Sequence, residues 1–399
     1  MALMRPLDGV RVLELSNYMA GPFCGMLLAD LGADVIKVEN PRGGDYGRAL
    51  GPFPTGSSDG AGFLRMNRNK RSVALDLKGP PGREAFELLA HRADVLVENF
   101  RPGTMEDLGL GYALLSHDNP GLVYVAISGF GATGRRRDRP GLDIIVQAES
   151  GLMSITGEPD GDPVKVGVPI VDLSAGLYAA LGAVSALRER DRTGRGTFLD
   201  LALLDTAVSL AVWESGVYFT TGDVPERLGS AHRVDAPYQA FRTADGYVVL
   251  GATSPRSWQA FVELLGIDEL RREEWSTPEK RRTRVKELAV IIERATRQRP
   301  TETWYAALSQ AGIPCGRIRG YDEVFTDEAL AERGMLIDIP APEHGTVRGL
   351  GSPLHFGSER AAIRRAAPRL GEHTREVLRE IGYDDATIDV LARDEASPA

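Results

Sequence analysis

One aspartate stands out among the residues that could do chemistry. Asp172 is the lone carboxylate in the run Val-Gly-Val-Pro-Ile-Val-Asp-Leu-Ser-Ala-Gly at 166–176. An apolar pattern at helical spacing follows it, formed by Leu173, Leu177, Leu181, Val184 and Leu187. An aspartate at a helix start is either an N-cap, whose side chain accepts a hydrogen bond from the first turn, or a nucleophile in a site built where chain ends meet. The local sequence leaves both interpretations open.

Basic residues gather in the first hundred positions. They occupy the segment 65–71, and single cations stand close to expected strand ends at Lys37, Arg42, Lys78 and Arg101. Because the formal net charge of the chain is −9, this cluster indicates either a local pocket for phosphates or a solvated charged rim. The residues alone do not decide between the two.

Other kinds of site have little support. A Gly-x-Gly-x-x-Gly match at 129–134 is followed by an arginine-rich stretch with a proline and no apolar periodicity, so it indicates a turn and not a dinucleotide site. Ser-His-Asp chemistry has little support in the sequence. Cys24 lies in an apolar helical stretch, where packing is its expected role. The two cysteines and six histidines have no zinc-like spacing, so no metal site is predicted.

Composition bounds the class of protein. The chain has 399 residues, 43% hydrophobic and 26% charged, which is enough for two domains or for one large domain with an insertion. The net charge of −9 argues against a nucleic-acid partner. Two cysteines favour a reducing compartment. No apolar run approaches the roughly 18 residues of a membrane span, and no signal-peptide core is visible. We therefore expect a soluble cytoplasmic protein with no membrane partner.

The elements that must position Asp172 alternate between strand and helix in the first 130 residues. Strands are expected at 10–15, 32–39, 72–77, 94–98 and 122–128, and helices at 23–31 (opened by Pro22) and 82–91. This alternation is typical of βαβ units and a mostly parallel sheet. In such sheets ligands bind outside the carboxyl ends of the strands. The loops at 16–21, 40–48 and 99–103 are therefore the expected walls of a site.

The rest of the chain has a different pattern. A strand is expected at 197–203, a helix at 204–221, and a hairpin with an Asp-Gly turn at 238–251. Helices are expected at 257–266, 278–297, 301–311, 374–381 and 384–393. The sequence thus predicts an α/β fold with a large domain over 1–220, a smaller α+β domain over 225–325, and a C-terminal segment over 330–399 that returns to the large domain.

Several segments carry a family resemblance, and they run in family order over nearly the whole chain. They are Pro6-Leu-Asp-Gly-Val-Arg-Val-Leu-Glu-Leu with Ala20-Gly-Pro, Leu31-Gly-Ala-Asp-Val-Ile-Lys-Val-Glu, Asn69-Lys-Arg-Ser-Val-Ala-Leu-Asp-Leu-Lys, Asp94-Val-Leu-Val-Glu-Asn-Phe-Arg-Pro-Gly, Thr193-Gly-Arg-Gly, Ile313-Pro-Cys-Gly and Leu370-Gly-Glu-His-Thr. Jointly they resemble the class III CoA-transferases, a family that includes formyl-CoA transferase, carnitine CoA-transferase and the 2-methylacyl-CoA racemases.

The resemblance implies a site and an assembly. The family's aspartate nucleophile falls on Asp172. Its CoA contacts fall on Met19, Ala20, Glu39, Asn40, Leu75, Lys78, Asn99, Phe100, Arg101 and Asp143. The family fold has a Rossmann-like large domain and a small domain, and two subunits are interlocked as rings in a homodimer. Coenzyme A would enter as a thioester substrate, with a carboxylic acid as acceptor and no permanently bound cofactor.

The implied mechanism is carboxylate chemistry. An aspartate is ionised at pH 7 without a general base, and the family route runs through mixed anhydrides and an aspartyl-CoA thioester. Its tetrahedral intermediates need oxyanion donors. We expect them among the backbone N–H groups near Asp172 and in the loop 229–232, which could close as a lid. His232 in that loop is expected to be a surface residue.

Two positions depart from the family pattern. The racemase branch has Gly-His-Asp where this chain has Gly141-Leu142-Asp143, and Leu142 cannot exchange a proton. Family members often have an arginine at the position of Asp107, so Arg101 is a candidate to replace it. CoA transfer is therefore the leading hypothesis. A 2-methylacyl-CoA racemase or epimerase and a non-catalytic CoA-binding homologue are the alternatives.

Overall fold

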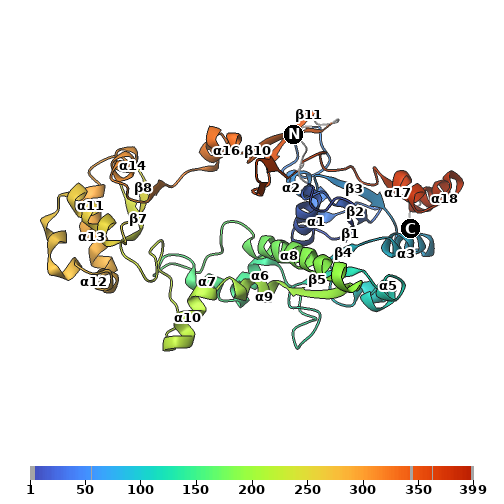
Figure 1. Cartoon of the computed structure of the whole chain (residues 1–399), viewed down its shortest axis with the longest axis horizontal. Coiled ribbons are helices and arrows are strands. Elements are labelled where there is room, and N and C mark those ends of the chain that lie inside the picture. The colour runs from blue at the N-terminus through green and yellow to red at the C-terminus, as the bar shows by residue number, and fades with distance from the viewer. Residues whose placement is uncertain (1–4, 55, 342–344, 362, 397–399) are drawn as a thin grey trace. The chain divides into compact units, whose positions relative to one another are not determined.

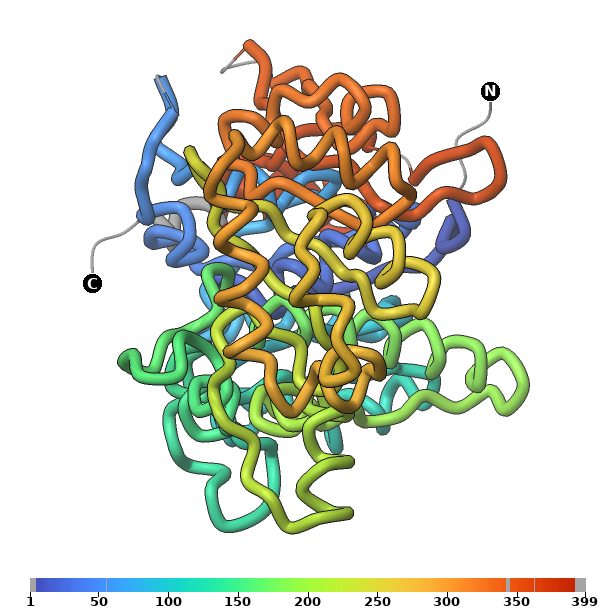
Figure 2. Tube along the Cα trace, turned by 90° about the vertical axis from the view of Figure 1, so that its left-hand side faces the viewer, coloured from blue at the N-terminus to red at the C-terminus, as the bar shows by residue number. Residues whose placement is uncertain are grey.

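The computed structural model describes residues 5–54, 56–341, 345–361 and 363–396. They divide into two compact units. The larger unit holds the chain up to Leu152, residues Val166–Gly216, and the chain from Glu328 onward, whereas the smaller unit holds Met153–Lys165 and Val217–Asp327. Figures 1 and 2 show the segments of each unit, coloured along the chain.

A parallel six-stranded sheet forms the centre of the larger unit. Its strands are β1 (Arg11–Leu15), β2 (Asp34–Glu39), β3 (Lys70–Ala74), β4 (Val95–Glu98), β5 (Val123–Ser128) and β6 (Thr197–Ala202). They lie in the order β3-β2-β1-β4-β5-β6, and every neighbouring pair is parallel. This is the strand order of a Rossmann fold. The expected α/β class with a Rossmann-like sheet is confirmed.

Helices cover both faces of this sheet (Figure 1). They are α1 (Ala20–Asp30), α3 (Pro80–His91), α5 (Tyr112–Asp118), α8 (Ile170–Thr193), α9 (Leu203–Ser209), α17 (Thr374–Glu380) and α18 (Asp385–Ala396). Val12 and Val125 are buried with α1, α8 and α9 on one face. Leu13 and Tyr124, each one residue away, are buried on the other. Successive side chains of a strand point to opposite faces, so neighbours in sequence enter separate cores.

Helix α8 corrects one expectation from the sequence. By length and composition it is apolar enough to cross a membrane, although we expected no run of that kind. Its buried residues include Val171, Ala175, Ala179 and Ala183, and all four belong to the core on the sheet. Because the core helix of a globular unit meets the same criterion, this composition is weak evidence for a membrane segment.

Several expected boundaries are shifted. Helix α1 begins at Ala20, so Pro22 is its third residue and not its first. Proline is tolerated there because the N–H groups of the first turn have no partner within the helix. Strand β3 covers Lys70–Ala74 instead of 72–77. Residues 129–134 form a turn with no helix after it, as predicted, and Gly131 and Gly134 have positive φ angles.

Two expected helices are each divided. The stretch 204–221 forms α9 and α10 (Val212–Thr221), and no Gly or Pro stands at the break. The stretch 278–297 forms α12 (Pro278–Thr283) and α13 (Val285–Thr296), interrupted where Arg284 leaves helical geometry at φ −121°.

The smaller unit has its own core. The expected hairpin is present as β7 (Tyr238–Arg242) and β8 (Tyr247–Gly251), joined by a loop that contains Asp245-Gly246, and β9 (Cys315–Arg317) pairs with β8. α11 (Pro255–Leu265), α13 and α14 (Thr301–Gln310) pack with this sheet through residues such as Phe241, Phe261 and Trp304. Its short elements are η2 (Asp268–Arg271), η3 (Glu273–Trp275), α12 and α15 (Tyr321–Val324).

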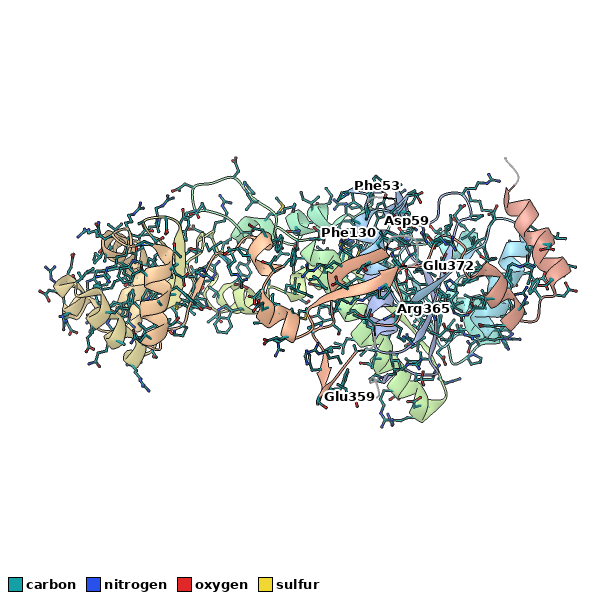
Figure 3. All side chains as sticks on the ribbon, turned by 90° about the horizontal axis from the view of Figure 1, so that it is seen from above. Phe53, Asp59, Phe130, Glu359, Arg365 and Glu372 are labelled. Atoms are coloured by element: carbon teal, nitrogen blue, oxygen red, sulfur yellow. The ribbon has the colours of Figure 1, made fainter. Side chains whose placement is uncertain are left out.

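The C-terminal segment returns to the edge of the parallel sheet. Asn69 N donates to Arg365 O at 3.1 Å, and His373 N donates to Ser72 O at 2.9 Å. Arg365 is labelled in Figure 3. Ala74 N donates to Thr374 Oγ1 at 3.0 Å. These bonds cover β3, which would otherwise leave an open strand edge.

The remaining elements are short. They are η1 (Tyr46–Ala49), α2 (Ala61–Met66), α4 (Thr104–Asp107), α6 (Asp143–Glu149), α7 (Leu152–Ile155), α16 (Glu328–Glu332), β10 (Leu336–Ala341) paired with β11 (Gly345–Leu350), and β12 (His355–Phe356) paired with β13 (Glu359–Arg360).

Candidate active site

Two of the loops that carry expected site residues meet where the strand order of the sheet reverses. β1 and β4 are neighbours at that point, which is where ligands bind in open α/β sheets. Asn17 N donates to Asn99 Oδ1 at 2.8 Å, and Asn99 Nδ2 donates to Asn17 O at 2.8 Å. Asn99 therefore joins the loop after β4 to the loop that leads into Met19 and Ala20.

Asp172 lies in the first turn of α8 but does not cap it. The helix begins at Ile170 and its N-cap position is Pro169. Asp172 is thus the third helical residue, and within the described chain its carboxylate accepts no hydrogen bond. The N-cap interpretation of Asp172 is wrong, because the chain enters the helix three residues earlier than the apolar pattern indicated.

The capping role belongs to Asp143, which comes from another helix. Asp143 Oδ1 accepts hydrogen bonds from the N–H of Val171 at 2.9 Å and of Asp172 at 3.4 Å. Its other oxygen accepts from Gln147 Nε2 at 2.6 Å, and Gln147 Oε1 accepts from Val166 N at 2.9 Å. Asp143 therefore accepts the hydrogen bonds from the N-terminal N–H groups of α8 and places a negative charge at its positive end. The Asp172 side chain is not needed for capping and can face a substrate.

The surroundings of Asp172 disfavour its charge. Burial raises the pKa of the Asp172 carboxyl to about 6, and the negative charge of Asp143 adds to this shift. At pH 7 the ionised form still predominates. A partly desolvated carboxylate without hydrogen bonds is more nucleophilic than a solvated one, so the environment suits covalent chemistry.

Helix α8 packs tightly on the start of α1. Gly176 stands one turn after Asp172, and a Cβ at that position would lie 2.8 Å from Ala20 O and 2.9 Å from Phe23 Cδ1. Only a glycine permits this approach. It brings the Met19-Ala20 loop against the helix that carries Asp172, so these three sequence-predicted site residues come together.

The expected oxyanion donors near Asp172 are already engaged. Ile170 N donates to Val168 O and Leu173 N to Pro169 O, while the N–H groups of Val171 and Asp172 donate to Asp143. The first turn of α8 therefore has no N–H group free for an oxyanion. This part of the expectation is wrong, because the N–H groups of Val171 and Asp172 already donate to Asp143.

The loop 229–232 belongs to the smaller unit, and three of its backbone N–H groups donate to carbonyl oxygens. Gly229 N donates to Gly157 O, Ala231 N to Leu228 O, and His232 N to Tyr238 O. The His232 ring stacks on Tyr238 with centroids 4.9 Å apart, and its Nδ1 accepts from Asp235 N at 3.2 Å. These three N–H groups are not free oxyanion donors, so the expectation for them is also wrong.

Three of the four basic residues of the segment 65–71 form buried ion pairs, whereas Arg65 is exposed. Arg68 pairs with Asp30 at 2.6 Å, Lys70 with Glu14 at 2.7 Å, and Arg71 with Glu380 at 2.6 Å. All three cations are buried. Neither sequence-based interpretation, phosphate pocket or solvated rim, describes them, because each cation is neutralised by a carboxylate far away in the sequence.

Glu39 is held in a second buried group. Arg48 Nε lies 2.8 Å from Glu39 Oε2 and Arg48 Nη1 lies 2.8 Å from Asp59 Oδ2, and Asp59 is labelled in Figure 3. Ser72 Oγ donates to Glu39 Oε1 at 2.6 Å. Burial opposes ionisation of Glu39, but Arg48 and Lys37 hold the pKa of its carboxyl below the usual range. The carboxylate that the resemblance assigns to CoA thus already has partners within the protein.

The other residues assigned to CoA differ in exposure. Asn40 and Lys78 are exposed at the ends of the loops after β2 and β3, while Leu75 is buried and its N–H donates to Glu39 O at 2.9 Å. Phe100 and Arg101 line a cavity of about 310 Å³ with Glu98. Burial raises the pKa of Glu98 to about 8. The cavity carries Arg101 at the carboxyl end of β4, although Asp107 lines the same cavity.

Sequence reasoning missed Gln147 and the true contacts of Asp143. A signal was present, because residues four apart on a helix face one another and Asp143 and Gln147 have this spacing. Cys24 is buried in the core, as expected for a packing residue. Among residues 5–54, 56–341, 345–361 and 363–396, no group of three His, Cys, Asp or Glu side chains could hold a metal ion.

The sequence of the chain matches a known family over most of its length. The family model described as CoA-transferase family III matches residues 7–374. The chain belongs to this family. Among its relatives, succinyl-CoA:glutarate CoA-transferase of Mus musculus is 38% identical over 97% of this chain and 89% of that one. Succinate–glutarate CoA-transferase of Agrobacterium fabrum is 39% identical over 94% of this chain and 96% of that one.

A solved structure supports the same conclusion. The crystal structure of a CAIB/BAIF family protein from Brucella suis superimposes with a TM-score of 0.85 at 37% identity, and the match covers 95% of this chain and all (100%) of that one. As a member of CoA-transferase family III, the chain is an enzyme of CoA transfer, with acyl-CoA and carboxylic acid as the substrate classes.

Proposed function

We propose that the chain transfers CoA from an acyl-CoA to a carboxylic acid through a covalent aspartyl-CoA thioester on Asp172. One observation carries this proposal. The Asp172 carboxylate stands in the first turn of α8 with no hydrogen bond from the described residues, while Asp143 satisfies the helix end in its place. The start of α8 is thus stabilised by Asp143, and the carboxylate of Asp172 is not needed for that purpose.

The proposed reaction needs no net proton transfer. An oxygen of Asp172 attacks the carbonyl carbon of the donor thioester and expels CoA as a thiolate, which leaves a mixed anhydride. The thiolate attacks the Asp172 carbonyl carbon, forming the aspartyl thioester and releasing the donor acid as a carboxylate. The acceptor carboxylate then attacks this thioester carbon and expels the thiolate, forming a second anhydride. The thiolate attacks the acceptor carbonyl and regenerates the Asp172 carboxylate.

In this proposal CoA contacts the loops after β1, β2, β3 and β4. The contacting residues are Met19, Ala20, Glu39, Asn40, Leu75, Lys78, Asn99, Phe100 and Arg101. Their support is topological, because these loops lie at the carboxyl edge of the sheet on both sides of the reversal point. Glu39 and Leu75 are engaged or buried through their side chains, so their contacts to CoA run through the backbone. Asp143 acts on Asp172 instead of on CoA.

We also propose that the substrate acids are aliphatic dicarboxylic acids. The relatives in mouse and in Agrobacterium are named for succinate and glutarate, and both acids carry a second carboxylate that does not react. The exchange of one such acid for another leaves the chemistry at Asp172 unchanged.

A racemase reaction lacks support at one position. Leu142 stands at the N-cap of α6, and its side chain is exposed and carries no group that could exchange a proton. Proton exchange at the α-carbon requires an acid or base on each face of that carbon.

The proposed assembly is the interlocked homodimer of the family. Its support is an exposed apolar surface on the larger unit, formed by Leu177, Tyr178 and Leu181 of α8, Val208 of α9, and Val212 and Trp213 of α10. Tyr178 of α8 lies next to α9, where Ser209 Oγ donates to Tyr178 Oη at 3.2 Å. Exposed apolar side chains on successive helices are typical of a protein interface.

The test of the mechanism is to trap the covalent intermediate. The protein is incubated with succinyl-CoA and then treated with hydroxylamine, and the peptide that contains Asp172 is examined by mass spectrometry. A hydroxamate at Asp172 supports the aspartyl thioester, and Asp172→Ala should abolish both the adduct and CoA transfer. Turnover with no adduct at Asp172 would refute this route. Deuterium entering the α-carbon without an acceptor acid would favour racemisation.

A further inference from the structure

The loop after β1 has an unusual backbone. Tyr18 has a φ angle of +65°, which is rare for a bulky residue and raises its energy. Strained residues of this kind persist where the surrounding structure holds them, and they are concentrated at functional sites.

Buried charges hold this conformation. Tyr18 N donates to Asp45 Oδ1 at 3.0 Å. The other oxygen of Asp45 pairs with Lys37 Nζ at 2.9 Å, and the same ammonium donates to Ser16 O at 2.7 Å. Lys37 has no exposed surface. Burial opposes its charge, but Glu14 and Asp45 raise the pKa of Lys37 above its usual range. The loop is thus fixed at both ends by one fully buried cation.

The outcome is an aromatic pair that faces solvent. The ring of Tyr18 stacks on Tyr46, with centroids 5.4 Å apart and planes at 17°, and the two residues are 49% and 63% exposed. In the described part of the chain, neither hydroxyl has a hydrogen-bond partner. The fold therefore maintains a strained, buried support for two side chains that add nothing to its core.

Tyr18 belongs to the loop that packs against the helix of Asp172. Tyr18 is two residues before Ala20, whose carbonyl oxygen touches Gly176, and Gly176 is one helical turn after Asp172. Residue spacings along these steps limit the Cα separation of Tyr18 and Asp172 to about 20 Å. The side chains of both residues and a short diacid together span such a distance.

The buried cations beneath the pair are not available to bind an anion. Lys37 and Lys70 are paired with Glu14, and Arg48 is paired with Glu39 and Asp59. The phenol hydroxyls are donors without partners beside them, and a hydroxyl donates well to a carboxylate. The nucleotide end of CoA is separated from the thiol by the whole pantetheine arm, so a residue close to Asp172 meets the acyl end.

We propose that Tyr18 and Tyr46 recognise the distal carboxylate of a dicarboxylic acceptor, with their rings against its methylene groups. This inference rests on the proposed function and assigns the specificity of that site. The two tyrosines are specificity residues in this scheme, and Lys37 and Asp45 are positioning residues that hold them.

The test compares acids that differ only in the distal group. The double variant Tyr18→Phe/Tyr46→Phe keeps both rings and removes both hydroxyls. CoA transfer from succinyl-CoA is measured with glutarate and with pentanoate, which has the same chain length but one carboxylate. We expect the KM for glutarate to rise about tenfold or more, while kcat/KM for pentanoate, which has no distal carboxylate, changes less than twofold. Thermal melting checks that the variant is folded.

The matched control is Tyr321→Phe. Tyr321 is also exposed and stacked, on Phe325 with centroids 4.9 Å apart, but it has no positive φ. This control should leave the glutarate-to-pentanoate ratio unchanged. An unchanged ratio in the double variant overturns the inference. So does a result in which the double variant Tyr18→Leu/Tyr46→Leu loses CoA affinity while the phenylalanine variant is normal, because that indicates stacking with the nucleotide.

The two proposals can fail separately. If the wild type transfers CoA and forms the Asp172 adduct, but the tyrosine variants keep the acceptor preference, only the specificity inference fails. If the wild type forms no adduct at Asp172 while acceptor preference still depends on the hydroxyls, the covalent mechanism fails and the specificity inference stands.

Discussion

At the residue scale, the proposed chemistry depends on the different roles of two aspartates. Asp143 accepts the hydrogen bonds at the start of α8, and Asp172 keeps an unpaired carboxylate in the same turn. Either aspartate could have capped the helix, since aspartate is among the favoured residues at that position. Because the N-cap position is Pro169, Asp172 lies within the helix. Asp143 of α6 accepts the hydrogen bonds that a capping side chain would accept.

Replacing Asp172 should show that its ionised carboxylate lowers the free energy of unfolding. Its carboxyl has a pKa of about 6 in the folded protein, above the usual 3.8. The folded state therefore binds more protons than the unfolded state between about pH 4 and 6, and the free energy of unfolding falls as pH rises through that window. Asp172→Asn removes this loss, so the variant should be about 1–2 kcal/mol more stable at pH 8.

Urea unfolding of wild type and Asp172→Asn at pH 8 and pH 4 measures this effect. The difference should shrink toward zero at the lower pH, where the wild-type carboxyl is protonated. A variant that is less stable than wild type at pH 8 would contradict the assigned environment of Asp172.

A second prediction concerns the charge of Asp143. Its negative charge adds to burial in raising the pKa of Asp172. Asp143→Asn removes the charge and keeps an oxygen that can accept from Val171 N, so the acid limb of kcat/KM should move down by about one pH unit. A pH–rate profile from pH 4.5 to 8 provides the measurement. The matched variant Asp200→Asn should leave the limb in place, since Asp200 accepts its hydrogen bond from Ala132 N and does not shift Asp172.

At the element scale, the position of α8 on α1 decides where Asp172 lies. Gly176 allows the two helices to approach so closely that a Cβ would collide with Ala20 O. The same contact presses the Met19-Ala20 loop against the reactive helix. Buried ion pairs of Lys37 and Arg48 then fix the neighbouring loops.

Enlarging Gly176 should therefore separate the two helices. Gly176→Leu should lower the free energy of unfolding by about 1–3 kcal/mol and reduce CoA transfer, because the loop of Ala20 moves away from Asp172. Gly62→Ala is the control, since a Cβ there meets nothing within 4 Å, and it should be neutral or slightly stabilising. Chemical denaturation and kcat/KM measure both variants. Equal effects of the two substitutions would show that the close approach of α8 is unimportant.

At the scale of the whole molecule, the exposed apolar surface on α8, α9 and α10 is the basis of the proposed dimer. Leu181 is 62% exposed and Trp213 is 60% exposed, yet α8 buries its opposite side in the core on the sheet. The burial of such side chains in a second subunit would contribute about 1.5–3 kcal/mol for each one.

We expect the chain to be a dimer whose folding depends on this surface. Leu181→Glu should abolish the dimer and leave an unstable monomer, because a charge would be buried without a partner. Light scattering after size exclusion measures the mass, and circular dichroism measures the fold. Val290→Glu, at an exposed apolar residue of α13 in the smaller unit, is the control and should remain dimeric. A wild type that stays monomeric at micromolar concentration would contradict the proposal.

Local pattern was sufficient for the strands and most helices. The period of two in strands and the apolar spacing of helices are local properties, so the sequence predicted the α/β class, the turn at 129–134, the hairpin after Tyr238, and Asp172 as the residue of interest. The motif order also indicated the family. Boundaries were less certain, as the start of α1 at Ala20 and the break before α10 show.

Only the tertiary structure decided what each charged group does. Asp143 caps α8, Lys70 pairs with Glu14, and Glu39 pairs with Arg48, and in each case the partners lie on different elements. The pKa of an ionisable group depends on its burial and on the charges around it. Neither can be deduced from the pattern of adjacent residues in the sequence. The sequence by itself therefore singled out Asp172 as the candidate nucleophile, whereas the packing of α6 and α1 against α8 decided that Asp143, and not Asp172, accepts the hydrogen bonds at the start of the helix.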